Sequence, residues 1–151
     1  MFFNKELCLF HIKPTNQNQL FEEMFQKLLN AECVKDSYID GITKRESEYP
    51  TGLEVNGIGF AIPHTDSEHV IQSQVCFASL EEPIIFSDMT DKDRFIQVQL
   101  VFMLAMSSPH EQVDILQNLV ELFQNQEKIN QLLKCKKTDE FVHLINSAGV
   151  Y

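Results

Sequence analysis

Apolar residues recur along this chain with two spacings, and each spacing predicts one type of element. Over residues 17–30 they return every three or four positions, which predicts a helix with one buried face. A second helix is expected from Ser37 to about Tyr49. Its inward-facing candidates are Tyr38, Ile42 and Tyr49.

Shorter apolar runs predict strands. One covers residues 7–12 and is expected at a sheet edge. Residues 75–80 alternate as a strand does, Pro83 breaks the run, and residues 84–86 resume an extended segment before a charged turn. The longest run, Phe95 to Met106, predicts a largely buried strand with five side chains on one face: Ile96, Val98, Leu100, Phe102 and Leu104.

Helical spacing returns after this long strand. It starts with a sequence that resembles a capping box, with serine as the N-cap, proline at the first helical position and glutamate three residues after the serine: Ser108-Pro109-His110-Glu111. The helix is expected to run to about Gln124 and to bury Val113, Leu116, Leu119, Val120 and Phe123. Shorter helices are expected over residues 126–133 and 139–147. Strands and helices therefore interleave over residues 1–151, which predicts one α/β domain with helices on both faces of a β-sheet.

The composition of the chain disfavours several classes of function. The chain has 151 residues and a formal net charge of −10. Such an acidic chain is a poor candidate for binding the phosphate backbone of nucleic acid, which needs clustered Lys and Arg. The cysteines show neither a C-x-x-C pair nor zinc-type spacing. The N-terminus lacks a secretory signal, and no apolar run reaches the roughly 18 residues of a membrane span. These observations favour a reduced, cytoplasmic protein.

One stretch organises the candidate chemistry. A turn-rich segment, residues 49–57, leads into the apolar run Ile58 to Ile62, which is expected to be a buried strand. Gly59 inside the run permits close approach of another group. Pro63 cannot donate to a strand ladder and stops the run. His64 is therefore expected at the mouth of the strand, where α/β proteins tend to place their chemistry.

Three residues suit an anion: His64, His110 and Arg45. His64 and His110 each follow a proline after a strand-like run, so both imidazoles open onto one cleft if the two strands are neighbours. Arg45, near the end of the preceding helix, could reach this cleft, but it also fits a solvated face shared with Lys44, Glu46 and Glu48. Two histidines and an arginine suit a phosphoryl group, whose transfer needs mainly positioning and charge stabilisation.

A metal site is the competing hypothesis. It would be built from His64, Asp66, His69 and His110. The spacing from His64 to His69 is not a tight metal signature, and the loop between them is not expected to be helical. His69 also fits an ordinary surface histidine. The two remaining histidines lie on apolar segments and are expected to be structural: His11 and His143.

Two segments carry a resemblance to a known family: Arg45-Glu46-x-x-x-Pro50-Thr51-Gly52-Leu53 and Gly57-Ile58-Gly59-Phe60-Ala61-Ile62-Pro63-His64. They look like the signature of enzyme IIA components of the fructose/mannitol class, in the bacterial phosphoenolpyruvate-dependent sugar phosphotransferase system. The resemblance covers essentially the whole chain. The continuation looks most like the galactitol-type branch: Thr65-Asp66-Ser67-Glu68-His69-Val70. The implied fold of residues 1–151 is a mixed β-sheet flanked by helices, the mannitol/fructose-type IIA fold.

The resemblance implies a cytoplasmic phosphocarrier. His64 would match the phosphoacceptor, which takes a phosphoryl group from phospho-HPr and passes it to a cysteine of a IIB component. Arg45 would match the arginine that balances phosphoryl charge, and His110 the histidine that hydrogen-bonds the phosphoryl oxygens. No metal or organic cofactor is implied. The IIB component and the IIC membrane permease would be on other chains, and the membrane component would select the sugar or polyol.

Two other functions remain alternatives. A regulatory IIA of the nitrogen-related type uses similar residues but acts by binding other proteins. A metal-dependent hydrolase would use the clustered histidines.

In the phosphocarrier, the reacting nitrogen of His64 must be unprotonated. Its other nitrogen should therefore carry the proton and donate it to an acceptor. Thr51 and Asp66 are possible neighbours, and the sequence does not choose that acceptor.

Overall fold

The computed structural model describes residues 2–150 and is built on one long antiparallel pair of strands, β4 (Gln74–Asp88) and β5 (Asp91–Ala105). Three shorter strands extend this pair into a five-stranded mixed sheet: β1 (Cys8–Ile12), β2 (Gly52–Val55) and β3 (Ile58–Ala61). β1 lies at an edge of the sheet, as expected from its sequence, and it runs parallel to β4. On the other side, β3 runs parallel to β5, and β2 lies antiparallel beside β3.

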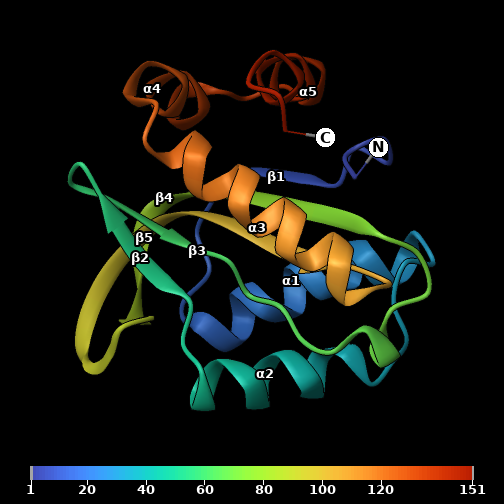
Figure 1. The fold of residues 1–151 in the computed structure, drawn as a ribbon. Coiled ribbons are helices and arrows are strands. Elements are labelled where there is room, and N and C mark those ends of the chain that lie inside the picture. The colour runs from blue at the N-terminus through green and yellow to red at the C-terminus, as the bar shows by residue number, and fades with distance from the viewer. Residues whose placement is uncertain (1, 151) are drawn as a thin grey trace.

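Helices cover both faces of the sheet (Figure 1). On one face lie α1 (Gln17–Asn30) and α2 (Tyr38–Glu48), and on the other lie α3 (Pro109–Phe123), α4 (Gln126–Lys134) and α5 (Thr138–Ser147). The buried apolar residues form two clusters, one on each face. The fold class expected from the interleaved elements is confirmed. Among residues 2–150, none of these helices combines the length and apolar character that a bilayer crossing requires.

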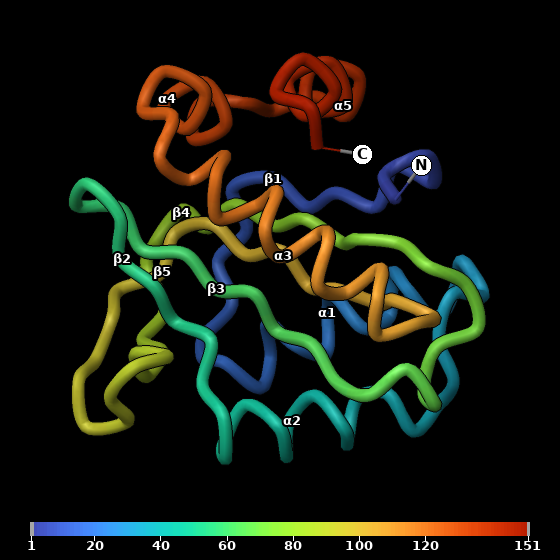
Figure 2. The backbone as a smooth tube through the Cα atoms, in the orientation of Figure 1, coloured from blue at the N-terminus to red at the C-terminus, as the bar shows by residue number. Residues whose placement is uncertain are grey.

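Both ends of the described chain lie on the same side of the sheet, near α5 (Figure 2). Phe3 packs edge-on against Phe141 of α5, with ring centroids 5.7 Å apart. Phe141 also stacks on Phe77 of β4 at 4.4 Å. The start of the chain and its last helix therefore share one aromatic cluster with the central strands.

The helix before β2 ends earlier than expected. Tyr38 and Ile42 of α2 are buried, as predicted, but Tyr49 is 65% exposed, so its predicted inward position is wrong. α2 ends at Glu48, and Tyr49 leaves the helix with a φ of −132°. Its ring instead lies against Arg45, whose guanidinium carbon is 5.3 Å from the ring centroid.

The segment before β3 is a strand, whereas the sequence predicted only turns there. β2 and β3 pair along their whole length as a hairpin. Asn56 and Gly57 connect them with φ values of 53° and 80°. Left-handed φ values at both positions are typical of the tight turns that favour Asn-Gly between antiparallel strands. The dipeptide was therefore an available hairpin signal.

β5 exchanges its faces part-way along, so the expectation of a single buried face is wrong. Ile96 and Val98 join the cluster beneath α1 and α2, and the other three expected residues join the cluster beneath α3. The pairing with β3 explains the change. Gly59 lies opposite Val98, but the next residue, Phe60, lies opposite Leu100. One extra residue on β5 reverses the alternation beyond it.

The same irregularity explains why Pro83 does not end β4. Ser79 lies opposite Leu100 and Ile84 lies opposite Val98, so residues 80–83 face a single residue of β5. Proline is tolerated at such an irregularity because no ladder N–H is needed there. The expected break is therefore a bulge within one continuous strand.

α3 begins as predicted, and its predicted buried face is only partly right: Leu119 and Phe123 are buried and Leu116 is half-buried. The Ser108 hydroxyl accepts the Glu111 N–H at 3.3 Å, which confirms the cap. Val113 and Val120 were expected to be buried, but they are 52% and 37% exposed. The buried residues are Ile115, Leu119, Leu122 and Phe123. Apolar residues form two adjacent stripes on this helix, and spacing alone does not say which stripe meets the sheet.

Candidate functional site

His64 lies where β3 ends, beside the carboxyl end of β5. Pro63 has no N–H to donate, and its carbonyl oxygen accepts the Leu104 N–H at 2.9 Å. His64 then forms an isolated parallel bridge with Leu104. Because α3 starts shortly after β5, the His64 backbone and the start of α3 lie at the same edge of the sheet. This is the strand-mouth location expected from the sequence.

One ring nitrogen of His64 is bound to the backbone. Nδ1 lies 2.7 Å from the carbonyl oxygen of Ile62. Because a carbonyl oxygen can only accept, Nδ1 carries the proton of the neutral ring and Nε2 keeps its lone pair. The acceptor is neither Thr51 nor Asp66, the two neighbours considered from the sequence.

The surroundings of His64 favour its neutral form. Burial is the largest effect and lowers the pKa of the imidazole from its ordinary value of 6.5. The hydrogen bond to Ile62 opposes this by raising the pKa, the positive charge of Arg45 lowers it, and the negative charge of Asp66 raises it. The net direction of the pKa shift is downward. His64 is therefore neutral at pH 7, the form that a nucleophile requires.

Arg45 reaches the site from the last turn of α2. Its Nη1 lies 3.2 Å from Oδ1 of Asp66. Its Nε is buried and has no hydrogen-bond partner among the described residues. The side chain borders an open, polar cavity of about 350 Å³, whose lining also includes Lys44 and Tyr49. Arg45 thus stands at the rim of a charged cavity and is close enough to His64 to act on its charge.

His110 occupies the second position of α3, as expected, but its ring turns to its own helix. Nε2 lies 3.2 Å from Oδ2 of Asp114, one helical turn further on, and the side chain is 88% exposed. Across residues 2–150, no hydrogen bond joins His110 to His64 or to Arg45. The structure therefore brings Arg45 close enough to act on the charge of His64 and gives the His110 ring no hydrogen bond to either residue.

The residues of the metal hypothesis do not converge. Nδ1 of His69 lies 2.8 Å from the Ser37 hydroxyl, and its Nε2 lies 3.6 Å from a carboxylate oxygen of Glu68. Asp66 pairs with Arg45. Within the described part of the chain, no three side chains of His, Cys, Asp or Glu are placed to hold a metal ion. The geometry gives the metal-site hypothesis no support.

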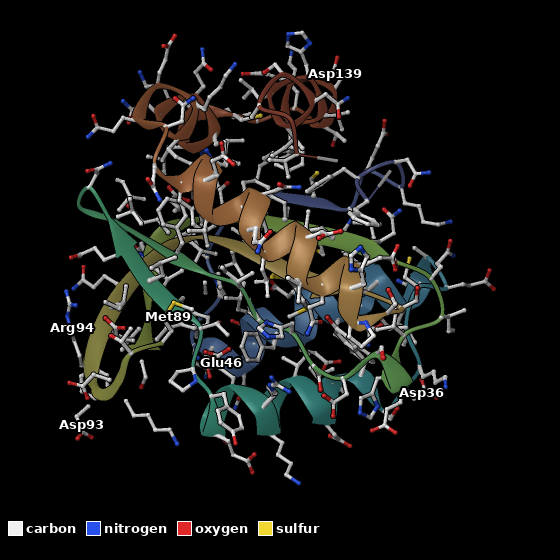
Figure 3. All side chains as sticks on the ribbon, in the orientation of Figure 1. Asp36, Glu46, Met89, Asp93, Arg94 and Asp139 are labelled. Atoms are coloured by element: carbon white, nitrogen blue, oxygen red, sulfur yellow. The ribbon has the colours of Figure 1, made fainter. Side chains whose placement is uncertain are left out.

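Glu46 fits a solvated face by its sequence context, but the structure buries it between α2 and the sheet (Figure 3). One carboxylate oxygen accepts the Thr51 N–H at 2.7 Å and the other accepts the Thr51 hydroxyl at 2.9 Å. Burial raises the pKa of Glu46 to about 7, although the two hydrogen bonds from Thr51 lower it. The available sequence signal was its four-residue spacing from Tyr38 and Ile42, the buried residues of the same helix.

Comparison with protein families matches residues 1–148 to the family described as "Phosphoenolpyruvate-dependent sugar phosphotransferase system, EIIA 2". The chain belongs to this family. The membership confirms the resemblance seen in residues 45–64, and it makes the chain a phosphoryl-transfer component of a sugar phosphotransferase system.

Two curated relatives of this EIIA 2 protein are identical to it at about a quarter of the aligned residues. It is 24% identical to the galactitol-specific EIIA component of Escherichia coli (strain K12) over 127 residues, which are 84% of this chain and 84% of that protein. It is also 24% identical to the mannitol-specific phosphotransferase enzyme IIA component of Staphylococcus aureus (strain N315) over 149 residues, 97% of this chain and 96% of that protein.

Solved structures share the fold at still lower identity. A putative PTS IIA domain from Streptococcus pyogenes M1 GAS superposes with a TM-score of 0.79 at 19% identity, covering 97% of this chain and 93% of that one. The IIA–IIB complex of the mannitol system from Escherichia coli, with phosphorylated IIB, gives 0.76 at 21%, covering 94% and 95%. Nitrogen regulatory protein IIA-Ntr from Neisseria meningitidis gives 0.72 at 21%, covering 93% of each chain.

Proposed function

We propose that this EIIA 2 protein is a phosphocarrier that accepts a phosphoryl group from phospho-HPr on Nε2 of His64 and passes it to a IIB component. One observation carries the proposal: the hydrogen bond between Nδ1 and the Ile62 carbonyl oxygen, at 2.7 Å. It leaves Nε2 unprotonated on a ring whose pKa is lowered by burial. Such a nitrogen is a ready nucleophile at neutral pH.

The chemistry is a pair of in-line transfers. In the first, the Nε2 lone pair attacks phosphorus, a nitrogen–phosphorus bond forms at His64, and the bond between phosphorus and its donor atom on phospho-HPr breaks. In the second, a cysteine thiolate of IIB attacks the same phosphorus, and the electrons of the nitrogen–phosphorus bond return to Nε2. The loose transition state spreads charge over three oxygens, so nearby cations and N–H donors stabilise it.

Arg45 and His110 are the proposed donors to those oxygens. Arg45 already lies close enough to lower the pKa of His64, and in this role its guanidinium would share its donors between Asp66 and the phosphoryl group. His110 would have to turn away from Asp114. Its ring is largely exposed, so this rotation meets little steric resistance. Exposed side-chain contacts of this kind contribute little to stability and are easily exchanged.

The partners are inferred from the family and its relatives. The mannitol IIA of Escherichia coli is solved in complex with phosphorylated IIB, and we propose an equivalent encounter here. Galactitol- and mannitol-specific relatives are equally similar at 24% identity, so the proposal names a sugar or polyol system, with galactitol as one candidate. A IIC permease on another chain would carry the substrate across the membrane.

A regulatory IIA of the nitrogen-related type is the second candidate. It is supported by the similarity in fold to nitrogen regulatory protein IIA-Ntr. Both candidates accept a phosphoryl group on the same histidine. They differ in the fate of that group, because the phosphocarrier discharges it to a IIB component and the regulator does not need one.

The deciding experiment is intact mass spectrometry after incubation with phosphoenolpyruvate, enzyme I and HPr. We expect one acid-labile phosphoryl group on the wild type, none on His64→Ala, and a full one on His143→Ala, whose histidine lies in α5. Full phosphorylation of His64→Ala would remove the proposed acceptor. An unmodified wild type would remove the phosphocarrier. Discharge by a IIB component then favours transport over regulation.

His110→Ala belongs in the same experiment. We expect it to be phosphorylated about tenfold more slowly, or to lose the phosphoryl group faster, because one donor to the transferring oxygens is gone. Its thermal stability should stay close to wild type, since the replaced ring is 88% exposed. A wild-type rate and an unchanged lifetime of the phospho-form would exclude His110 from the site.

A further inference from the structure

We propose that Glu46 is a positioning residue that holds His64 in its reactive tautomer and orientation, acting through Thr51 and Ile62. The use made of that orientation rests on the proposed phosphocarrier function. The contacts themselves do not depend on it.

The first link joins α2 to the start of β2. Glu46 is 6% exposed and Thr51 is 3% exposed. The carboxylate accepts two hydrogen bonds from this one threonine, from its N–H at 2.7 Å and from its hydroxyl at 2.9 Å. Both Thr51 groups donate, so both carboxylate oxygens act as acceptors. The hydroxyl hydrogen is thereby directed at Glu46, and the lone pairs of the hydroxyl oxygen are left for another donor.

The second link joins β2 to the end of β3. The Ile62 N–H donates to the Thr51 hydroxyl oxygen at 3.2 Å. Ile62 is itself 1% exposed, so water does not compete for this N–H. The next residue, Pro63, is held on its other side by the Leu104 N–H. Ile62 is therefore fixed from both directions along the chain.

The third link reaches the reactive ring. The carbonyl oxygen of Ile62 accepts from Nδ1 of His64 at 2.7 Å. A histidine's second ring nitrogen sets the tautomer and the direction of the first, so the position of this carbonyl decides where Nε2 points. Glu46, Thr51 and Ile62 thus form one continuous set of buried hydrogen bonds that ends on the nucleophile.

Space-filling alone would not call for a carboxylate at this position. Glu46 forms no ion pair among the described residues, although Lys92 lines the same small cavity of about 140 Å³. A buried carboxylate without a cation is costly, and its burial is reflected in the raised pKa. What it supplies is two acceptors on one rigid group, which fixes both donors of Thr51 at once. An amide in its place offers only one acceptor.

The test compares Thr51→Val with Thr51→Ser and adds Glu46→Gln. Valine keeps the shape but removes the hydroxyl, leaving the Ile62 N–H unpaired, whereas serine keeps the hydroxyl. Asp88→Asn is the control, because Asp88 is also a buried carboxylate that accepts an N–H and a hydroxyl from one threonine, Thr90, at 2.8 and 2.7 Å. Both of these bonds go to Oδ1, and Oδ2 pairs with Arg94 at 3.0 Å, so asparagine removes mainly the ion pair. The Asp88 side chain lies in the β4–β5 turn and not in the set that ends on His64.

Two readouts separate positioning from stability. Nitrogen-15 NMR of unphosphorylated protein reports which ring nitrogen of His64 carries the proton, and rapid-quench kinetics with phospho-HPr give kcat and KM. We expect Thr51→Val to mix the two tautomers and to lower kcat about tenfold with little change in KM. Thr51→Ser should restore both to within about twofold, and Glu46→Gln should shift both in the same direction as valine. Asp88→Asn should lower the stability of the protein and leave the His64 tautomer and kcat unchanged.

A structural role predicts another pattern. If Thr51→Val and Glu46→Gln lose stability as Asp88→Asn does but keep the wild-type tautomer and kcat, the inference is wrong. Should Thr51→Val fail to fold, the Glu46→Gln comparison decides in the same way. If phospho-HPr never modifies the wild type, the proposed function fails, and the NMR comparison still tests the positioning by Glu46.

Discussion

The charge state of His64 is set by residues of opposite sign that also bind each other. Arg45 lowers the pKa of His64 and Asp66 raises it, and the two are paired at 3.2 Å. Replacing either one therefore acts on the imidazole twice, by removing its own charge and by releasing its partner. Both effects have the same sign in each case.

We therefore predict opposite shifts of the His64 pKa in Arg45→Ala and Asp66→Asn. Removing the cation should raise the pKa, and removing the anion should lower it, as an NMR titration of the His64 ring would report. Arg45→Lys keeps the charge and is the control, with a pKa close to wild type. No shift in either variant would mean that burial alone governs the ring, and shifts in the same direction would contradict the prediction.

Glu46 makes a contribution to stability that depends on pH. Its pKa is raised by burial from 4.5 to about 7, so the folded state binds the carboxyl proton more tightly than the unfolded state does. This contribution is fully present below about pH 4.5 and is lost as pH rises through about 7. The stability lost between the low-pH and high-pH limits through this carboxyl group amounts to roughly 3 kcal/mol.

The measurement is the free energy of unfolding in urea, for wild type and Glu46→Gln, across that pH range. As pH rises, the wild type should lose free energy of unfolding relative to Glu46→Gln. His64 has a lowered pKa and changes stability in the opposite sense, with a loss as pH falls below 6.5. Both proteins contain His64, so its effect cancels in the difference. A difference that stays constant with pH would show that Glu46 has an ordinary pKa.

For single residues, the sequence predicts where a side chain lies better than it predicts which groups that side chain contacts. Proline at position 63 is enough to put His64 at the end of a strand, because the ladder cannot continue through it. The acceptor of its Nδ1 is the backbone carbonyl of Ile62, a group that every residue possesses and that leaves no mark in the sequence. Glu46 has the pattern of a buried position but the chemistry of an exposed one. Only the tertiary contact with Thr51 resolves that conflict.

Among the elements, the sequence predicts the bounds of the helices well, but it misses β2, divides β4 at Pro83 and starts β5 at Phe95 instead of Asp91. It also predicts less well which face an element buries. α1 has the expected bounds, and the other predicted helices differ by one residue or so at their ends. β5 does not alternate regularly along its whole length, because a bulge opposite Gly59 and Phe60 changes which side chains face each side of the sheet. In α3, apolar spacing does not identify the buried face, because Val113 and Val120 form a second, exposed apolar stripe beside the buried one. In both cases the decision depends on a neighbouring element, which local pattern does not contain.

The bulge in β5 depends on the absence of a side chain on β3. A Cβ added at Gly59 would lie 2.0 Å from the carbonyl oxygen of Gln97 and 2.7 Å from its carbonyl carbon. Both are backbone atoms of β5, so relief requires the two strands to separate. Gly57 offers the contrast: its φ is +80°, but a Cβ there would meet nothing within 4 Å.

We predict that Gly59→Ala destabilises the protein by about 3 kcal/mol and also slows phosphorylation, because separating β3 from β5 displaces His64. Gly57→Ala should cost only about 1 kcal/mol, the strain of a left-handed backbone, and leave phosphorylation unchanged. Urea unfolding and the phospho-HPr assay measure the two effects. Equal costs for the two variants would argue against the close approach at Gly59.

The whole molecule has two apolar clusters but one central pair of strands. β4 and β5 contribute residues to both clusters, since their side chains alternate between the faces. Neither α1 and α2 on one side nor α3 to α5 on the other can pack without this pair. His64 comes from the sheet itself, at the end of β3, and Arg45 comes from α2, on one face of the sheet. The site therefore requires the sheet and the α2 layer to be in place.

Because both clusters share β4 and β5, we predict that destabilising one cluster also destabilises the other. Phe141 of α5 is fully buried and packs against Phe3, Phe10 and Phe77, so Phe141→Ala should lower the free energy of unfolding by about 3 to 5 kcal/mol. If folding is a single cooperative event, native-state hydrogen exchange should show the same loss for amides of α1, across the sheet, as for those of α5. Loss of protection confined to α4 and α5 would instead show that these helices unfold as a separate unit, leaving β4, β5 and the His64 site intact.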